Sequence, residues 1–285
     1  MIYVVMLFQS LLASGTHIVA KAVVTDVDPT TLTLLRSGLA GGILYVISIL
    51  RGKPLKVDTE DRGMFLLLSF LGIPLNQFLF LTGLHASRPT NAALFYGATP
   101  ALVLVFSVLL KKEKRSLMRL IGVLVAFSGI LVVIFEHGFS VGAETLLGDL
   151  MLLGAVVAWT FYTVLGRDMI TKYGPVHATS VTMVWGMAMF LPFGLFSAAR
   201  FDYSSLTGTD IWGIAYLAIG TSIITYLLWY YALGKMAPSK VAIFANTQPV
   251  FTMILAYFFL GDVLTPWFLM GAAITLGGVL LTEIG

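Results

Sequence analysis

Long apolar runs follow one another along almost the whole chain, with short polar turns between them. Each run is close to the roughly 20 residues that a helix needs to cross a bilayer. Asp28-Pro29 and Tyr173-Gly-Pro175 are typical of the turns. The pattern predicts an all-α integral membrane protein with ten transmembrane helices: Ile2–Ala22, Thr30–Leu50, Gly63–Leu84, Pro89–Leu110, Leu117–Glu136, Gly148–Gly166, Val176–Ala198, Asp210–Leu233, Ser239–Leu260 and Pro266–Glu283.

The fourth and ninth predicted helices share a sequence pattern that begins with a proline. Residues at a constant spacing of 149 positions match without a gap: Pro89 with Pro238, Ala93 with Ala242, Phe95 with Phe244, Pro100 with Pro249, Glu113 with Asp262, Ser116 with Thr265, Gly122 with Gly271 and Gly129 with Gly278. Such a correspondence indicates an internal duplication. We therefore expect two five-helix repeats, residues 1–137 and 148–285, within one membrane domain.

The distribution of Lys and Arg predicts how these repeats are oriented. Most of the 17 basic residues lie in the loops after the even-numbered helices, the densest group being Lys111-Lys-Glu-Lys-Arg115. Basic loops favour the cytoplasmic side, so both termini are predicted to be cytoplasmic. An odd number of helices per repeat then inverts the second copy. The counterpart of the basic group, Leu260–Leu264, carries no Lys or Arg, as an external loop should.

Composition narrows the functional classes. Hydrophobic residues make up 58% of the chain and charged residues 11%, against about 25% charged in soluble domains. The net charge of +3 comes from loop residues, which orient the protein or meet anionic lipid, so nucleic-acid binding is not expected. The absence of cysteine excludes disulfides, thiol catalysis and thiolate metal sites. We expect no cofactor and no metal.

Inverted repeats favour a secondary transporter. They place two half-sites about an axis in the membrane plane, and rocking one half against the other opens a midplane site to alternate sides. A channel and an intramembrane enzyme remain as alternatives. No charged ring supports a channel. Ser14 and His17 share one helix, but no acid accompanies them to complete a catalytic set.

Polar residues within the predicted helices are the candidate binding site, because polar groups in hydrocarbon face the bundle interior. The predicted substrate-binding residues are Ser14, His17, Asn76, Gln77, Tyr96, Trp159, Thr163, Thr225, Tyr226 and Asn246. His17 is the candidate for proton coupling, since imidazole titrates near neutral pH; the alternative is a neutral, hydrogen-bonded histidine. Arg36 is a fixed cation that could bind a substrate carboxylate or serve a structural role.

The three prolines Pro74, Pro100 and Pro249 are predicted kink or gating points, because proline frees a backbone carbonyl. Uncharged hydrogen-bonding groups with aromatic walls suit a small amphipathic solute, such as a zwitterionic or aromatic amino acid. No Asp or Glu lies deep within a predicted helix, which disfavours a strictly cationic substrate. Aromatic faces can still bind organic cations, so a carrier for organic cations or drugs stays as the alternative.

Several motifs resemble one family of transporters. They are Gly148-Asp-Leu150, Ala158-Trp-Thr-Phe-Tyr-Thr-Val-Leu-Gly-Arg167, the paired proline-led helices and Arg36 within Leu34-Leu-Arg-Ser-Gly-Leu-Ala40. Together they resemble the EamA family, the ten-helix branch of the drug/metabolite transporter superfamily. The resemblance implies export of amino acids or other metabolites across the cytoplasmic membrane of a prokaryote. It also implies that helices one to four and six to nine surround a central cavity.

In that arrangement helices five and ten stand outside the cavity. Gly122 and Gly129 of helix five, and Gly271 and Gly278 of helix ten, lie two turns apart. Small residues at this spacing let helices pack closely. We expect these helices to pack on neighbours or on a partner chain, and a homodimer through helices five and ten is a possible assembly.

Overall fold

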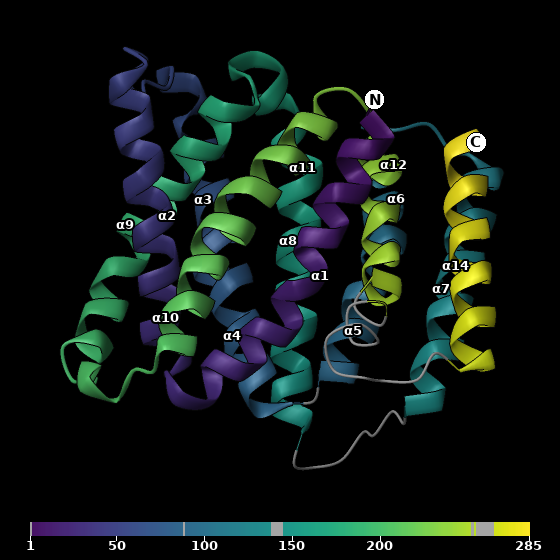
Figure 1. Ribbon diagram of the computed structural model, residues 1–285. Helices are drawn as coiled ribbons and strands as arrows, with labels where there is room; N and C mark the ends of the chain where they lie inside the picture. Colours follow the sequence, from purple (N-terminus) through teal and green to yellow (C-terminus); the bar gives the residue numbers. More distant parts are fainter. Residues whose placement is uncertain (1, 88, 138–144, 252–253, 255–264) are drawn as a thin grey trace.

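The computed structural model describes residues 2–87, 89–137, 145–251, 254 and 265–285, and all regular secondary structure among them is helical (Figure 1). Seven helical segments are long and apolar enough to cross a membrane. They are Ile2–Asp26 (α1), Pro29–Leu50 (α2), Thr59–Ala86, Leu146–Tyr173 (α8), Pro175–Ala198 (α9), Gly208–Leu233 and Pro266–Ile284 (α14). An all-α membrane protein was therefore the right expectation.

Of the other predicted helices, the fourth and ninth are interrupted and the fifth is continuous. The fourth is divided into α5 (Pro89–Gly97) and α6 (Thr99–Leu109), because Pro100 has no N–H and its ring excludes the carbonyl of residue 96. The fifth is α7 (Leu117–His137). The ninth begins as α12 (Pro238–Ala242) and a 3₁₀ turn, Ile243–Thr247, and most of the rest lies outside the described residues. The count of ten membrane-spanning helices therefore stays a prediction.

Two of the long segments contain a π-helical stretch at their centre. Between α3 (Arg62–Phe70) and α4 (Phe78–Ala86) lies the first π-helical segment, Leu71–Gln77. Between α10 (Gly208–Ala215) and α11 (Tyr226–Leu233) lies the second, Tyr216–Thr225. The spacing of 149 residues carries residues 71–77 onto 220–226, so the two segments overlap. Pro74 accounts for the first, whereas the second contains no proline.

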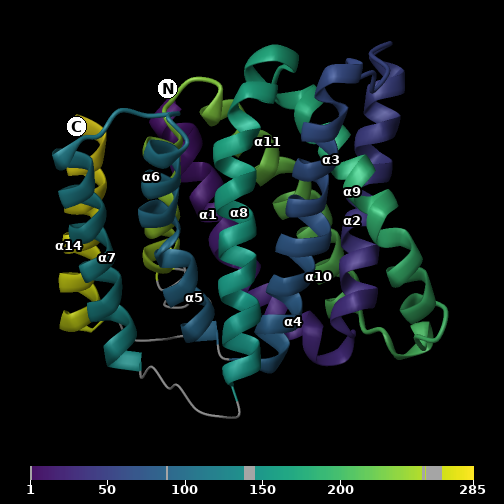
Figure 2. The ribbon, with the colours of Figure 1, turned by 180° about the vertical axis from the view of Figure 1, so that it is seen from behind.

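Helices α7 and α14 stand side by side at one edge of the molecule, opposite the edge formed by α2 and α9 (Figures 1 and 2). Their contact, which we call the glycine seam, uses Gly122 and Gly129 of α7 and Gly271 and Gly278 of α14. A methyl group on Gly129 would lie 2.6 Å from the Gly271 carbonyl oxygen. The predicted close packing thus occurs within the chain. A homodimer stays a prediction, and it would use other faces of the same helices.

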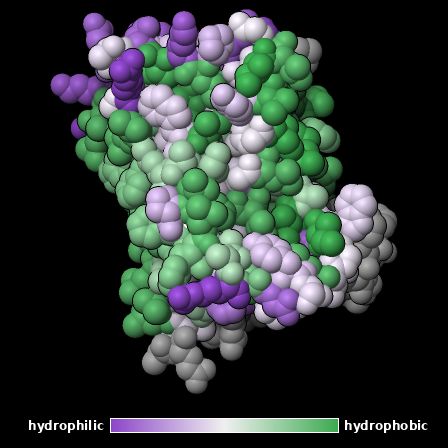
Figure 3. All heavy atoms as spheres, turned by 90° about the vertical axis from the view of Figure 1, so that its left-hand side faces the viewer, coloured by the Kyte–Doolittle hydropathy of each residue, from purple (hydrophilic) through white to green (hydrophobic). Residues whose placement is uncertain are grey.

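Both termini lie at the same end of the helix bundle (Figure 1). Seen from the α2 and α9 side, apolar side chains form a broad belt, and many of the hydrophilic ones gather at the end where the termini lie (Figure 3). Exposed apolar residues in such a belt contact lipid. The buried interior is mostly apolar but includes polar residues from α1, α2, α8 and the two π-helical segments. These buried polar residues define the candidate site.

Candidate substrate-binding cavity

A central cavity of about 90 Å³ lies where the two π-helical segments approach α1, α2 and α8. Its lining includes most of the predicted site residues: His17, Arg36, Asn76, Gln77, Tyr96, Trp159, Thr225 and Tyr226. It also includes residues that were not predicted: Gln9, Ala13, Thr16, Phe80, Thr99, Thr221, Trp229, Ala245 and Gln248. No group of three or more His, Asp or Glu side chains that could hold a metal ion is found in the described part of the chain.

Arg36 occupies one part of the cavity wall and is 4% exposed. Its Nε donates to Ser222 Oγ at 2.6 Å, and its Nη2 donates to Thr221 Oγ1 at 2.9 Å. Both hydroxyls in turn donate to the Leu217 carbonyl oxygen, at 3.0 and 2.6 Å. Ser and Thr hydroxyls that bond to backbone carbonyls locally disturb a helix, which fits the π-helical geometry here. Arg36 is thus held by neutral oxygen atoms.

Amide and phenol groups continue the polar wall from this point. Gln77 Nε2 lies 3.4 Å from the Tyr226 hydroxyl, at the long end of hydrogen bonding. Tyr226 donates to Asn76 Oδ1 at 3.4 Å, and Asn76 Nδ2 donates to the Tyr96 hydroxyl at 3.1 Å. A second bond from Asn76 Nδ2, to the Ala155 carbonyl at 2.9 Å, fixes the side chain against α8. Gln77 Nε2 also lies 3.5 Å from Ser222 Oγ, so side chains at the cavity join the two π-helical segments.

Some polar atoms around the cavity are buried without a hydrogen-bond partner among the described residues. These are the side-chain oxygens of Gln9 and Gln77, Nδ1 of His17 and both amide atoms of Asn246. The His17 side chain has a hydrogen-bond partner in Gln248. Buried polar groups are normally paired, and each unpaired one costs about 1–3 kcal/mol. A cluster of them beside a cavity is what a site for a polar solute, or for the water that replaces it, requires.

An aromatic cluster forms another part of the wall. The Trp159 ring stacks on Tyr162 at 5.4 Å between centroids and meets Tyr226 edge-on at 5.0 Å. Trp229 lies 5.4 Å from Trp159 and donates its indole N–H to Thr163 Oγ1 at 3.2 Å. Aromatic pairs in these arrangements add stability beyond the area they bury. This wall is therefore rigid and apolar.

Ser14, Thr163 and Asn246 are predicted residues that lie beside the cavity and are not part of its lining. Ser14 donates to the Leu11 carbonyl at 2.6 Å, and Thr163 supports Trp229. The face of α1 that lines the cavity is Gln9, Ala13, Thr16 and His17. These positions follow the i, i+4, i+7, i+8 spacing of one helix face, so the sequence contained this signal. The predicted residue Ser14 follows Ala13 and lies one position away from this face.

The three predicted kink prolines have distinct surroundings. Pro74 lies within the first π-helical segment, and Pro100 lies in the first turn of α6, directly after the break from α5. Pro249 lies in the helical turn after the 3₁₀ stretch Ile243–Thr247. Each proline therefore accompanies a change in helix geometry. A gating role for them stays a prediction.

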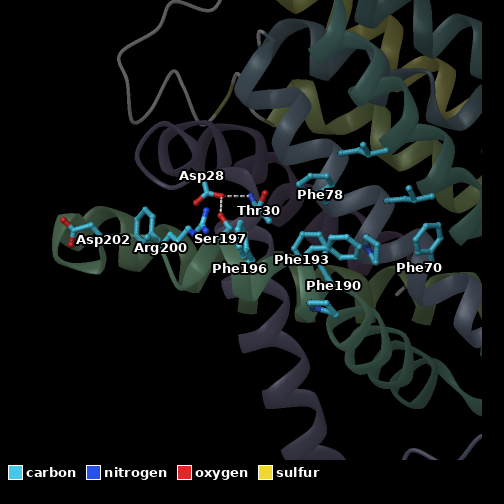
Figure 4. Close-up of a pocket in the computed structure, with 15 residues that line it drawn as sticks. Asp28, Thr30, Phe70, Phe78, Phe190, Phe193, Phe196, Ser197, Arg200 and Asp202 are labelled. Atoms are coloured by element: carbon cyan, nitrogen blue, oxygen red, sulfur yellow. Dashed lines mark hydrogen bonds between the residues drawn. The ribbon is translucent and has the colours of Figure 1, made fainter.

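A larger groove of about 1,060 Å³ lies on the flank of the molecule, between α9 and the first π-helical segment (Figure 4). Six of its fifteen lining residues are phenylalanines: Phe70, Phe78, Phe190, Phe193, Phe196 and Phe201. Charged residues lie at one end, among them Asp28, Arg200 and Asp202. None of the predicted polar contacts lines this groove. Volume favours the groove, but the convergent polar groups favour the central cavity as the binding site.

Asp28 in that groove has a structural role. Its Oδ1 accepts hydrogen bonds from the backbone N–H groups of Thr30 and Thr31, at 3.1 and 2.9 Å, which caps α2. Ser197 Oγ donates to the same oxygen at 2.8 Å and so ties α9 to this cap. Partial burial alone would raise the pKa of Asp28, but these hydrogen bonds lower it below its ordinary value.

A polar cavity within a bundle of apolar helices is the architecture of a membrane transporter. The model of the EamA-like transporter family matches residues 1–135 and 146–284. The chain therefore belongs to the EamA-like transporter family. These two segments lie close to residues 1–137 and 148–285, the ranges predicted for the two five-helix repeats.

Relatives with transporter names cover nearly the whole chain. The uncharacterized transporter YyaM of Bacillus subtilis is 30% identical, over 98% of this chain and 92% of its own length. An uncharacterized transporter of Archaeoglobus fulgidus is 25% identical, over 95% and 93%. A solved crystal structure shares the fold, with a TM-score of 0.81 at 18% identity and coverage of 98% and 97%. The chain is thus a multi-pass membrane protein of a transporter family.

Proposed function

We propose that the protein is an alternating-access carrier that exports small amphipathic metabolites, amino acids foremost, across the cytoplasmic membrane of a prokaryote. The observation that carries this proposal is the central cavity, where two π-helical segments bring a cation, amides and aromatic rings together. In this proposal two inverted five-helix repeats supply one half-site each. Rocking of the repeats would expose the cavity to one side of the membrane at a time.

Contacts between equivalent residues support an axis between the repeats. Residues related by a two-fold axis touch each other only where they lie close to it. Gln77 and Tyr226 are 149 positions apart and approach to 3.4 Å at the cavity. Ala126 and Thr275 have the same spacing, and Thr275 Oγ1 lies 3.4 Å from the Ala126 carbonyl oxygen at the glycine seam. The proposed axis would run through both places, so the cavity would lie on it.

Ion pairs at the end of the molecule where the basic loops lie support the proposed orientation. Lys172 pairs with Asp58 at 2.8 Å and with Asp61 at 2.5 Å, and its hydrogen bond lowers the pKa of Asp58. Lys112 pairs with Asp168. Each contact joins a loop that follows an even-numbered predicted helix to the C-terminal end of α8, on the side that the basic residues assign to the cytoplasm. They also link the two halves, and we propose that they break when the cavity opens inward.

The size and charge of the cavity favour a small solute. Pockets for drug-sized ligands usually measure about 300–1,000 Å³, well above the 90 Å³ of this cavity. No Asp or Glu is part of its lining within the described residues, and cation-selective sites in membranes usually hold a carboxylate. The second candidate, a carrier of organic cations, is favoured only by the aromatic wall of Trp159, Tyr226 and Trp229.

The test is efflux from proteoliposomes loaded with the twenty amino acids and a panel of organic cations, with and without an imposed pH gradient. Protein-dependent loss of particular amino acids is the expected result. Loss of the cations alone would select the second candidate. Retention of every solute, by protein that is folded and correctly inserted, would contradict export of either class.

The same assay tests His17 as the residue that couples transport to protons. His17 is the one histidine that lines the cavity, and its Nδ1 has no partner among the described residues. We expect His17→Gln to keep gradient-independent exchange of the amino acid while losing the acceleration by a pH gradient, because glutamine does not titrate. Equal acceleration in the variant and the native protein would remove His17 from the coupling mechanism.

A further inference from the structure

Arg36 is a buried cation that has no anion beside it among the described residues. Its guanidinium stays protonated in proteins, and an isolated buried charge is costly unless it is paired. The ion pairs found among the described residues lie elsewhere, joining Lys112 to Asp168, Arg119 to Glu113, and Lys172 to Asp58 and Asp61. Within the described chain, no carboxylate lies within 4.0 Å of Arg36. The described part of the chain therefore leaves this charge uncompensated, and a bound anion would compensate it.

The position of Arg36 suits it to receive a ligand. Ser222 and Thr221 take one hydrogen bond each from Nε and Nη2, and they hold the guanidinium plane in place. A guanidinium has five N–H groups, so these two bonds leave others for a ligand, and Arg36 lines the cavity. A carboxylate is the planar anion that two parallel N–H groups bind best. The two hydroxyls therefore orient a cationic binding group.

Neutral acceptors in the same cavity suit the other end of a zwitterion. The side-chain oxygens of Gln9 and Gln77 are buried and have no donor among the described residues. Both residues line the cavity. An ammonium group carries three donors and no acceptor. The cavity thus offers a cation for a carboxylate and free oxygens for an ammonium group.

We propose that Arg36 binds the carboxylate of the transported solute. The protein therefore selects solutes that carry a carboxylate, zwitterionic amino acids above all, over analogues in which a neutral group replaces the carboxylate. This inference rests on the proposed carrier function. It adds which chemical group of the solute the protein recognises and which residue recognises it. A purely structural arginine would affect all solutes alike, and this difference makes the proposal testable.

The first test compares efflux of amino acids with efflux of the corresponding amino-acid amides, which lack the carboxylate and keep the side chain. The native protein should export the acids at least about 30-fold faster, the effect of losing one partner of a buried charged contact. Arg36→Gln should abolish this preference. Arg36→Lys should restore part of it, since lysine keeps the charge and loses the two-pronged geometry.

Lys21→Gln is the matched control, because Lys21 is another cation on a membrane-spanning helix. Its ammonium donates to the carbonyl oxygens of Leu84 and Ser87, at 2.7 and 3.1 Å, and it is not part of the cavity lining. We expect Lys21→Gln to keep the preference for acids over amides even if it lowers the total rate. Equal export of acids and amides by the native protein, or an unchanged preference in Arg36→Gln, would overturn the proposal.

A binding measurement separates this inference from the carrier function. The thermal unfolding of purified protein is followed with millimolar alanine, alaninamide or propionate. Alanine and propionate should stabilise the native protein, alaninamide should not, and Arg36→Gln should respond to none of them. Stabilisation that needs Arg36 without any efflux would support the carboxylate site while contradicting the carrier function. Stabilisation by alaninamide equal to that by alanine, or no response to any of the three, would contradict the carboxylate site itself.

Discussion

The glycine seam and the central cavity are both places where the two halves of the chain meet, and they are built in opposite ways. At the seam, Thr275 and Thr282 donate to carbonyl oxygens of their own helix at 2.8 and 3.0 Å, and backbone lies against backbone. At the cavity, the amide oxygens of Gln9 and Gln77 have no donor within the part of the chain that the structure describes. Complete packing and pairing stabilise a structure, whereas incomplete pairing is typical of functional sites.

At the spacing of 149 positions, the glycines of the glycine seam are identical, whereas the residues at the central cavity differ. The seam keeps glycine in both copies, Gly122 with Gly271 and Gly129 with Gly278. At the cavity the spacing of 149 residues pairs Gln77 with Tyr226, two side chains with different chemistry. A seam requires only that both helices stay small on one side. A binding site for an asymmetric solute requires the two halves to differ. The comparison therefore predicts that substitutions at the seam change stability and that substitutions at the cavity change transport.

Gln77→Leu should show the largest difference between its effect on transport and its effect on stability. Gln77 is 1% exposed, and leucine of similar size would remove an unpaired buried oxygen, so the free energy of unfolding should hold or rise. Export should fall by about 10- to 100-fold, the value of one or two hydrogen bonds to a charged group. Efflux and thermal unfolding of the same preparation measure both effects. Loss of stability in proportion to transport would contradict the assignment of Gln77 to the binding site.

Gly278→Ala should affect stability without a specific effect on transport. The added methyl group would lie against the backbone nitrogen of Ala126, so α7 and α14 would have to separate. Overpacking of this kind costs about 1–3 kcal/mol of unfolding free energy. Gly277→Ala is the control, since no atom lies within 4 Å of a methyl group there. Equal unfolding midpoints for the two variants would show that the seam is not tightly packed.

Thr163→Val tests a residue that supports the cavity wall from behind. The substitution removes the acceptor of the Trp229 indole N–H, at 3.2 Å, and should cost about 1 kcal/mol of unfolding free energy. Thr160→Val is the matched control, because its hydroxyl donates only to the Val156 carbonyl of its own helix. Export should slow by a few-fold in Thr163→Val alone. Identical export and unfolding in the two variants would contradict a supporting role.

The sequence predicted the membrane fold, the family and eight of the seventeen residues that line the cavity, because apolar length and buried polarity are local signals. Asn76, Gln77, Trp159 and Tyr226 were found in this way. The second π-helical segment was not predicted, since no proline marks it and its geometry depends on hydroxyls that meet Leu217 and Arg36. On α1 the prediction of Ser14 missed the lining face by one residue, because adjacent positions on a helix point in different directions and a polar side chain alone does not show which face lines a cavity.

Phe193→Leu should have the smallest effect and decides whether the lateral groove belongs to the transport path. Phe193 is 72% exposed on the groove wall (Figure 4), and exposed substitutions usually change stability by less than about 0.5 kcal/mol. We expect export to change by less than about two-fold, a change worth under about 0.5 kcal/mol. Trp159→Leu, the corresponding aromatic change within the cavity, should lower export much more. A comparable loss of export in both variants would place the lateral groove on the route of the solute. The contrast between a binding cavity and a lipid-facing flank would then no longer hold.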